Sequence, residues 1–79
     1  MKVEIRHLKS LKHPNGDLIE IVEVNANVLN AEQIAAEVGA ALIEHGLKTF
    51  GEHAQMVNNQ TIFGGHVRNK ANGDCIIAV

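Results

Sequence analysis

The sequence predicts an α+β fold in the order ββαββ, with a four-stranded antiparallel sheet and one helix packed on one face. Three observations support this prediction. Two Asn-Gly pairs each separate runs rich in apolar residues, one long segment between them has helical spacing, and residues 47–60 follow neither the helix nor the strand period. Strands and a helix of this size form two layers around one core, so we expect a single domain over residues 1–79.

The first hairpin is predicted to turn at Asn15 and Gly16, which can adopt the two positive φ angles of a type I′ turn. This two-residue loop places Val3 opposite Val28 and leaves Arg6 on the other face of the sheet. A loop longer by one residue would bring Arg6 onto the apolar face, so we prefer the shorter loop. The residues then predicted to be buried beneath the helix are Val3, Ile5, Val22, Val24, Ala26 and Val28.

The helix is predicted to begin at Ala31, because Asn30 can cap it and Gln33 completes a capping box. It is predicted to end near His45, with Gly46 in the left-handed position that follows many helices. At 100° per residue, one stripe of apolar side chains faces the sheet. That stripe consists of Ala31, Ile34, Ala35, Val38, Ala41 and Leu42.

A third sector of the helix is predicted to be the interface of a homo-oligomer, most simply a dimer. It consists of Ala36, Gly39, Ala40 and Ile43, whereas a solvated helix face normally carries Lys, Glu or Gln. A chain of 79 residues buries only about 60% of its unfolded surface, and its single cysteine excludes an internal disulfide. The alternatives are that alanine here only favours the helix, or that a dimer forms through a sheet edge.

Residues 47–60 are predicted to form an ordered loop that can include a short helical turn. The second hairpin is predicted to turn at Asn72 and Gly73. Its register would pair Val67 with Ala78. The side chains on that face would be Phe63, Gly65, Val67, Ile76 and Ala78.

Charge and composition exclude several classes of function. Seven basic and nine acidic residues give a net charge of −2, and only two residues, Phe50 and Phe63, are aromatic, so general nucleic-acid binding is disfavoured. The amino-terminal stretch alternates charged and apolar residues, unlike a signal peptide or a membrane anchor. We therefore expect a cytoplasmic protein with a reduced thiol and no membrane partner.

The histidines and the cysteine do not predict a metal site, a cofactor or a nucleophile. The five histidines lack the close pairs, two to five residues apart, that zinc sites use, so no metal is expected. His7 is expected to be a buried, hydrogen-bonded neutral ring, and His45 to have a structural role. Cys75 would lie four positions from His66, about 13 Å along the strands, and is expected to be a small buried hydrophobe.

The candidate binding residues are Gly64, Gly65, His66, Arg68, Phe50 and His53. Glycines within a strand allow close approach of a ligand, although a bulge that bends the strand is the simpler interpretation. We predict a small non-catalytic interaction protein that acts as a homo-oligomer and binds a protein partner, of the accessory kind found in bacteria or their phages. The alternative is a binder of a small anionic or nucleotide-like ligand through residues 64–68. A third hypothesis is an enzyme with His53 or His66 as general base.

Overall fold

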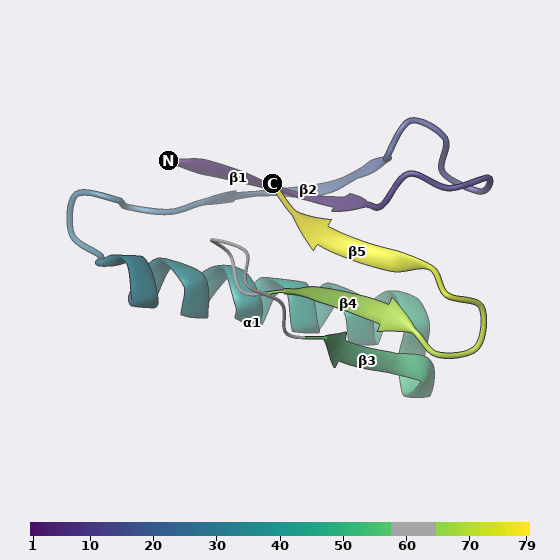
Figure 1. Cartoon of the computed structure of the whole chain (residues 1–79). Coiled ribbons are helices and arrows are strands. Elements are labelled where there is room, and N and C mark those ends of the chain that lie inside the picture. Colours follow the sequence, from purple (N-terminus) through teal and green to yellow (C-terminus); the bar gives the residue numbers. More distant parts are fainter. Residues whose placement is uncertain (58–64) are drawn as a thin grey trace.

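The structure is a computed structural model that describes residues 1–57 and 65–79. A five-stranded antiparallel sheet in the order β2-β1-β5-β4-β3 carries the helix α1 along one face (Figure 1). A short 3₁₀ helix, η1, connects α1 to β3. The elements are β1 (Lys2–His7), β2 (Leu18–Glu23), α1 (Ala31–Phe50), η1 (Gly51–His53), β3 (Ala54–Val57), β4 (His66–Asn69) and β5 (Cys75–Ala78).

The α+β class is confirmed, but the predicted number of strands is wrong. The order is ββαβββ, because β3 forms where residues 47–60 were expected to be a loop. The sequence of β3, Ala-Gln-Met-Val, is too short to show an alternation of apolar and polar residues, and its pairing with β4 supplies what the local pattern lacks. Residues 58–60 lie outside the described residues.

The start of α1 is confirmed and its predicted end is wrong. Asn30 and Gln33 form both hydrogen bonds of the capping box, and the helix begins at Ala31. It continues past Gly46 to Phe50, so Lys48, Thr49 and Phe50 are helical rather than part of a loop. Gly51 adopts the positive φ, 57°, and its N–H donates to the carbonyl of Leu47.

Gly46 lies inside the helix because α1 and β4 approach each other closely there. A Cβ atom built on Gly46 would stand 2.4 Å from Cγ1 of Val67, which is itself buried. Real Cβ atoms essentially never come so near another heavy atom, so only glycine fits without movement. From the sequence, Gly46 was expected to follow the end of the helix. Its contact with Val67 explains why a glycine stands inside the helix instead.

The predicted register of the first hairpin is wrong, although the face assignment is right for the paired residues. Val3 pairs with Val22 rather than Val28, and a bulge follows Ile5. The observed partner of Val3 differs from the predicted one by an even number of residues, so the side chains keep their faces. Val24 therefore still lies on the same face as Val3 and is buried. Val28, predicted to be buried, is 74% exposed, because it follows the end of β2; Ala26 is also exposed.

The longer loop explains this displacement. Residues 8–17 connect the strands, and the N–H of Gly16 donates to the carbonyl of His13 at 3.0 Å. Pro14 and Asn15 are therefore the central residues of the turn, with the glycine following them, which is the usual arrangement of proline in a type I turn. The hairpin prediction gave the central positions to Asn15 and Gly16 and so displaced the pairing.

The second hairpin differs from prediction in the same way. Val67 pairs with Ile76 rather than Ala78, and residues 70–73 form the loop, with Asn69 bonded to Asp74. The displacement is again even, so Val67 and Ile76 are buried on the helix side as expected. Phe63 lies outside the described residues.

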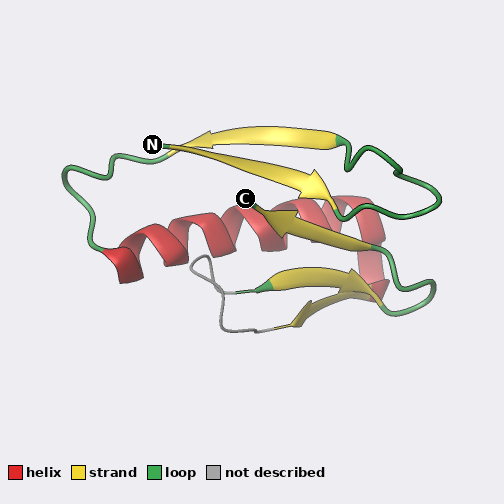
Figure 2. Cartoon of the chain, turned by 45° about the horizontal axis from the view of Figure 1, so that its top comes forward, coloured by secondary structure: helices red, strands yellow, loops and turns green. Residues whose placement is uncertain are grey.

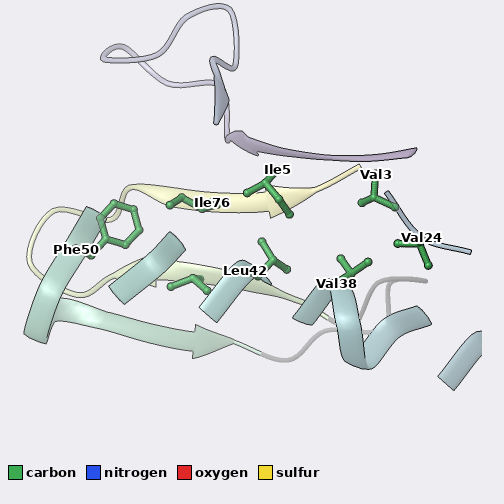
Figure 3. Packing of buried hydrophobic residues seen from close by; sticks show 8 residues of the cluster. Val3, Ile5, Val24, Val38, Leu42, Phe50 and Ile76 are labelled. Carbon is green, nitrogen blue, oxygen red and sulfur yellow. The ribbon is translucent and has the colours of Figure 1, made fainter. Parts of the chain in front are cut away.

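The core lies between α1 and the sheet (Figure 3). The helix packs mainly on β4, β5 and β3 and extends along one face of the sheet (Figure 2). Within the described residues the other face of the sheet carries no helix. Two of the predicted stripe residues are fully buried, three are half-buried and Ala31 is exposed. The core consists of Val3, Ile5, Val24, Val38, Leu42, Phe50, Val67 and Ile76.

The two glycines of α1 should respond in opposite directions to the same substitution. Gly46→Ala should lower the free energy of unfolding by about 2 kcal/mol, because the new methyl group overlaps Val67. Gly39→Ala is the matched control and should raise it by about 1 kcal/mol, because nothing lies within 4 Å of a Cβ there and alanine favours the helix. Urea unfolding followed by circular dichroism measures both, at concentrations where the chain is monomeric. Equal effects of the two substitutions would contradict the close approach at Gly46.

Candidate functional site

We call the face of the sheet away from α1, which no described helix covers, the uncovered face; it holds the predicted ligand-binding residues of β4. The register places His66 opposite Ile77 and Arg68 opposite Cys75, all on the side away from α1. Gly65 immediately precedes β4, is buried and has a φ of 144°. Gly64 lies outside the described residues, so the bulge predicted at Gly64 and Gly65 stays a prediction.

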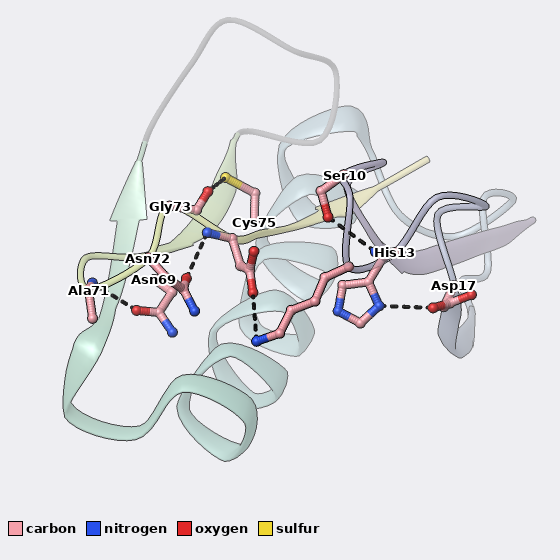
Figure 4. Close-up of polar contacts among 10 residues, drawn as sticks. Ser10, His13, Asp17, Asn69, Ala71, Asn72, Gly73 and Cys75 are labelled. Carbon is pink, nitrogen blue, oxygen red and sulfur yellow. Dashed lines mark hydrogen bonds and ion pairs between the residues drawn. The ribbon is translucent and has the colours of Figure 1, made fainter.

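Cys75 lies closer to His66 than predicted. It opposes Arg68, two positions from His66, which corresponds to about 7 Å along the strands rather than the predicted four positions. Its Sγ donates to the carbonyl of Gly73 at 3.5 Å (Figure 4). Burial raises the pKa of the Cys75 thiol, Arg68 opposes that shift, and Asp74 adds to it. A thiol with a raised pKa is mostly protonated at neutral pH, which does not favour a nucleophile.

Two other predicted site residues lie apart from this face. Phe50 is 7% exposed and packs in the core, so its ring is not available to a binding surface. His53 is exposed at the end of η1, and its carbonyl accepts a hydrogen bond from the N–H of Lys70. Neither these two residues nor His66 and Arg68 line any of the three hollows described for residues 1–57 and 65–79.

His45 has the structural role that the sequence predicts, but in the body of the helix rather than its last turn. Its Nε2 bonds to a carboxylate oxygen of Glu20 on β2, which ties the helix to the edge strand. His7 lies on the helix side of β1, as predicted, opposite Ile76. The predicted hydrogen bond is not found in the described part of the chain: Nδ1 of His7 is buried without a partner.

The loop of residues 8–17 encloses a hollow that sequence analysis missed. It has a volume of about 410 Å³ and lies between the loop and the ends of β1 and β5. Arg6 lies in its wall, where it donates to the carbonyl of Gly16 and to Glu4, both at 2.8 Å. Its charge is therefore already matched by a carboxylate. The hollow is lined by Arg6, His7, Leu8, Lys9, Asn15, Gly16, Ile77 and Val79.

The third sector of the helix continues into a longer apolar surface. Ala36, Ala40 and Ile43 are exposed, Gly39 is half-exposed, and Leu47 extends the row by one turn because the helix is longer than predicted. Met56 of β3 lies beside it. Ile43, Leu47 and Met56 are 44%, 58% and 36% exposed. They line a shallow hollow of about 70 Å³ whose floor is Ala54 and Val67.

We define this apolar surface by the residues Ala36, Gly39, Ala40, Ile43, Leu47 and Met56 and call it the helix–β3 surface. Sequence analysis found the first four. It missed the last two because residues 47–60 were expected to be a loop, although Leu47 continues the spacing of Ile43 and Gly39 along the chain.

Cys75 should react slowly with thiol reagents in the folded protein. Its raised pKa predicts slower modification at mildly alkaline pH than in the urea-unfolded chain, since only the thiolate reacts. Asp74→Asn should accelerate the reaction and Arg68→Gln should slow it, because the two charges act on the thiol in opposite directions. Release of the reagent's chromophore measures the rates. The same change in rate for both variants would contradict this electrostatic account.

Comparisons with known proteins do not assign this chain to a group. No protein-family model, no curated protein and no solved structure matches it. Within residues 1–57 and 65–79, no three His, Cys, Asp or Glu side chains are arranged to hold a metal ion. No helix in the described ranges has both the length and the apolar character needed to cross a membrane.

Proposed function

We propose that the protein is a small non-catalytic interaction protein that acts as a homodimer through the helix–β3 surface. The observation that supports this most is the continuity of that surface. Five of its members follow one helical row from Ala36 to Leu47, and the sixth, Met56, extends the row onto the neighbouring strand. Exposed apolar residues scattered singly are normal, but a contiguous apolar strip marks an interaction site.

Gly39 supports a close contact with a second backbone. Nothing lies within 4 Å of a Cβ built at this position, so no contact within the chain requires glycine. A glycine in the middle of a helix costs about 1 kcal/mol relative to alanine. The other glycine of α1, Gly46, lies where the helix meets β4. Approach of another helix would give Gly39 a corresponding role.

The helical row from Ala36 to Leu47 has a shape that can pack against a second copy of itself across a two-fold axis. Ile43 projects as a large side chain one turn after Gly39 and Ala40, which leave a shallow site. In an isologous dimer, Ile43 of each copy can occupy the site beside Gly39 of the other, since the contact of one residue with another is repeated in reverse. The dimer would bury side chains that a monomer of this size leaves in water.

Substitutions within the row test the dimer. Gly39→Leu or Ala40→Glu should shift the protein to monomer in sedimentation at micromolar concentration, because the first blocks close approach and the second buries a charge. Ala31→Glu is the matched control: Ala31 is exposed outside the row, in the first turn, where an acidic side chain favours the helix. It should leave the dimer intact.

Sedimentation of the wild type and the variants distinguishes a dimer through the helix–β3 surface from a monomer and from a dimer through a sheet edge. A wild-type protein that is monomeric throughout would contradict the proposal. A dimer that persists in both Gly39→Leu and Ala40→Glu would place the interface elsewhere, at a sheet edge. In the dimer, the uncovered face of the sheet stays available to the protein partner that we propose for it, in keeping with an accessory role in the cytoplasm of a bacterium or its phage.

The second candidate is binding of a small anionic or nucleotide-like ligand on the uncovered face of the sheet. The observation that favours it is the position of Arg68, which is exposed and forms no ion pair with any described residue, on the same face as His66. An arginine on an open face can bind a carboxylate or phosphate through two parallel hydrogen bonds.

Native mass spectrometry of freshly purified protein tests this second candidate. A bound small mass that disappears in the Arg68→Ala and His66→Ala double variant would support it, provided that the variant's thermal stability stays within about 1 kcal/mol of the wild type. A clean oligomer without added mass leaves the interaction protein as the better proposal. The third hypothesis, an enzyme with His53 or His66 as general base, rests on residue type alone.

A further inference from the structure

Two histidine rings are stacked where β1 meets the loop of residues 8–17. The rings of His7 and His13 have centroids 3.7 Å apart and planes inclined by 7°. His7 is the last residue of β1, and His13 belongs to the loop, immediately before its turn. The stack therefore connects the middle of the loop to the end of a central strand.

The two rings have different polar partners. Nδ1 of His13 lies 2.9 Å from a carboxylate oxygen of Asp17 in the same loop (Figure 4). Nδ1 of His7 is buried and, within the described ranges, has no hydrogen-bond partner. A proton on His13 would be matched by a carboxylate, whereas a second proton on His7 would add a charge in a site that offers it no direct partner.

The charged groups that face His7 are His13 and Asp17 from the loop and Asp74 from the turn before β5. Lys12 lies 3.9 Å from Asp74 and offsets part of that carboxylate. Burial, followed by the proximity of His13, holds the pKa of His7 below its ordinary value, and the two aspartates oppose this effect without cancelling it. His7 therefore resists protonation in the closed loop.

The stack belongs to a small set of contacts that hold the loop closed. The N–H of His7 donates to the carbonyl of Asp17 at 2.9 Å, and the N–H of Leu8 donates to the carbonyl of Cys75 at 2.9 Å. The carbonyl of His13 accepts from the N–H of Gly16. The first two bonds attach the loop to β1 and to β5, and the third closes the turn within the loop.

We propose that the stacked rings of His7 and His13 form a pH-sensitive latch that holds residues 8–17 closed while His7 is neutral and releases them when His7 gains a second proton. Two imidazolium rings at this separation repel each other, and only one has a carboxylate partner. Release alters the 410 Å³ hollow, because Asn15 and Gly16 of the loop form part of its wall. The latch does not depend on the proposed dimer.

The direction in which pH changes the closure of residues 8–17 follows from the protonation of His7. The closed loop should bind fewer protons at His7 than an open loop would, because opening would expose the ring and remove the neighbouring His13, which are the two causes of its lowered pKa. Closure is therefore fully favoured above the ordinary histidine pKa of about 6.5. It weakens as the pH falls from there towards the lowered pKa of His7.

Amide hydrogen exchange by NMR tests the latch directly, since the chain has neither Trp nor Tyr to report by fluorescence. The amides of His7 and Gly16 report on the loop, and those of Glu4 and Val79, which bond each other's carbonyls, report on the sheet. Between about pH 7.5 and 5.5, protection at the two loop amides should fall roughly tenfold relative to the sheet amides, after correction for the intrinsic exchange rate.

Three variants decide the cause of that fall. His7→Phe keeps a flat ring but cannot be protonated, so the fall should disappear. His13→Phe changes the ring on the loop side of the stack and is the second test if His7→Phe does not fold. The fall in protection should then shrink, because a phenyl ring does not repel an imidazolium. His53→Gln removes an exposed histidine and should leave the fall unchanged. The proposal would be overturned if protection of the loop amides did not change with pH in the wild type. It would also be overturned if both phenylalanine variants kept the full wild-type change.

Discussion

The contact of Gly46 with Val67 is the constraint on which much of this structure depends. It brings the backbone of α1 against β4 at a distance that no side chain on residue 46 would permit. The helix then continues for another turn, which carries Phe50 into the core and positions η1 and β3 at the edge of the sheet. The same continuation places Leu47 beside Met56. The contact of Gly46 with Val67 thus bears on two features at once: the burial of Phe50 in the core and the extension of the helix–β3 surface to Leu47 and Met56.

The parts of the fold that could be predicted from sequence are those decided by neighbouring residues. Asn30 and Gln33 form the capping box within one turn, and the alternation of side chains in β1 fixes which face is buried. Strand registers could not be predicted, because the loop of residues 8–17 is held by bonds to β1 and β5 that a two-residue turn does not require. The face assignments survived because both displacements were even.

The candidate sites divide in the same way, into features that follow from residue spacing and features that require the folded loop or helix. Ala36, Gly39 and Ile43 share a helix face by spacing alone, so they could be grouped without a structure. The stack of His7 on His13 could not be foreseen, since it requires the loop to fold back over the strand that precedes it. Burial of Phe50 was hidden for a related reason: a residue assigned to a loop gives no direction for its ring until the helix is known to reach it.

The two edges of the sheet differ in a way that limits how copies can join. β2 carries Glu20 and Glu23 along one edge, whereas β3, Ala-Gln-Met-Val, has no charged side chain at the other. Charged edge strands oppose the addition of further strands, and an uncharged edge does not. In the alternative dimer through a sheet edge, strand addition at β3 would join two copies, and the outer edges of that pair would then both be the acidic β2. That pair would be closed to further strand addition, because its charged edges oppose it, so the edges of the sheet oppose growth into a fibre.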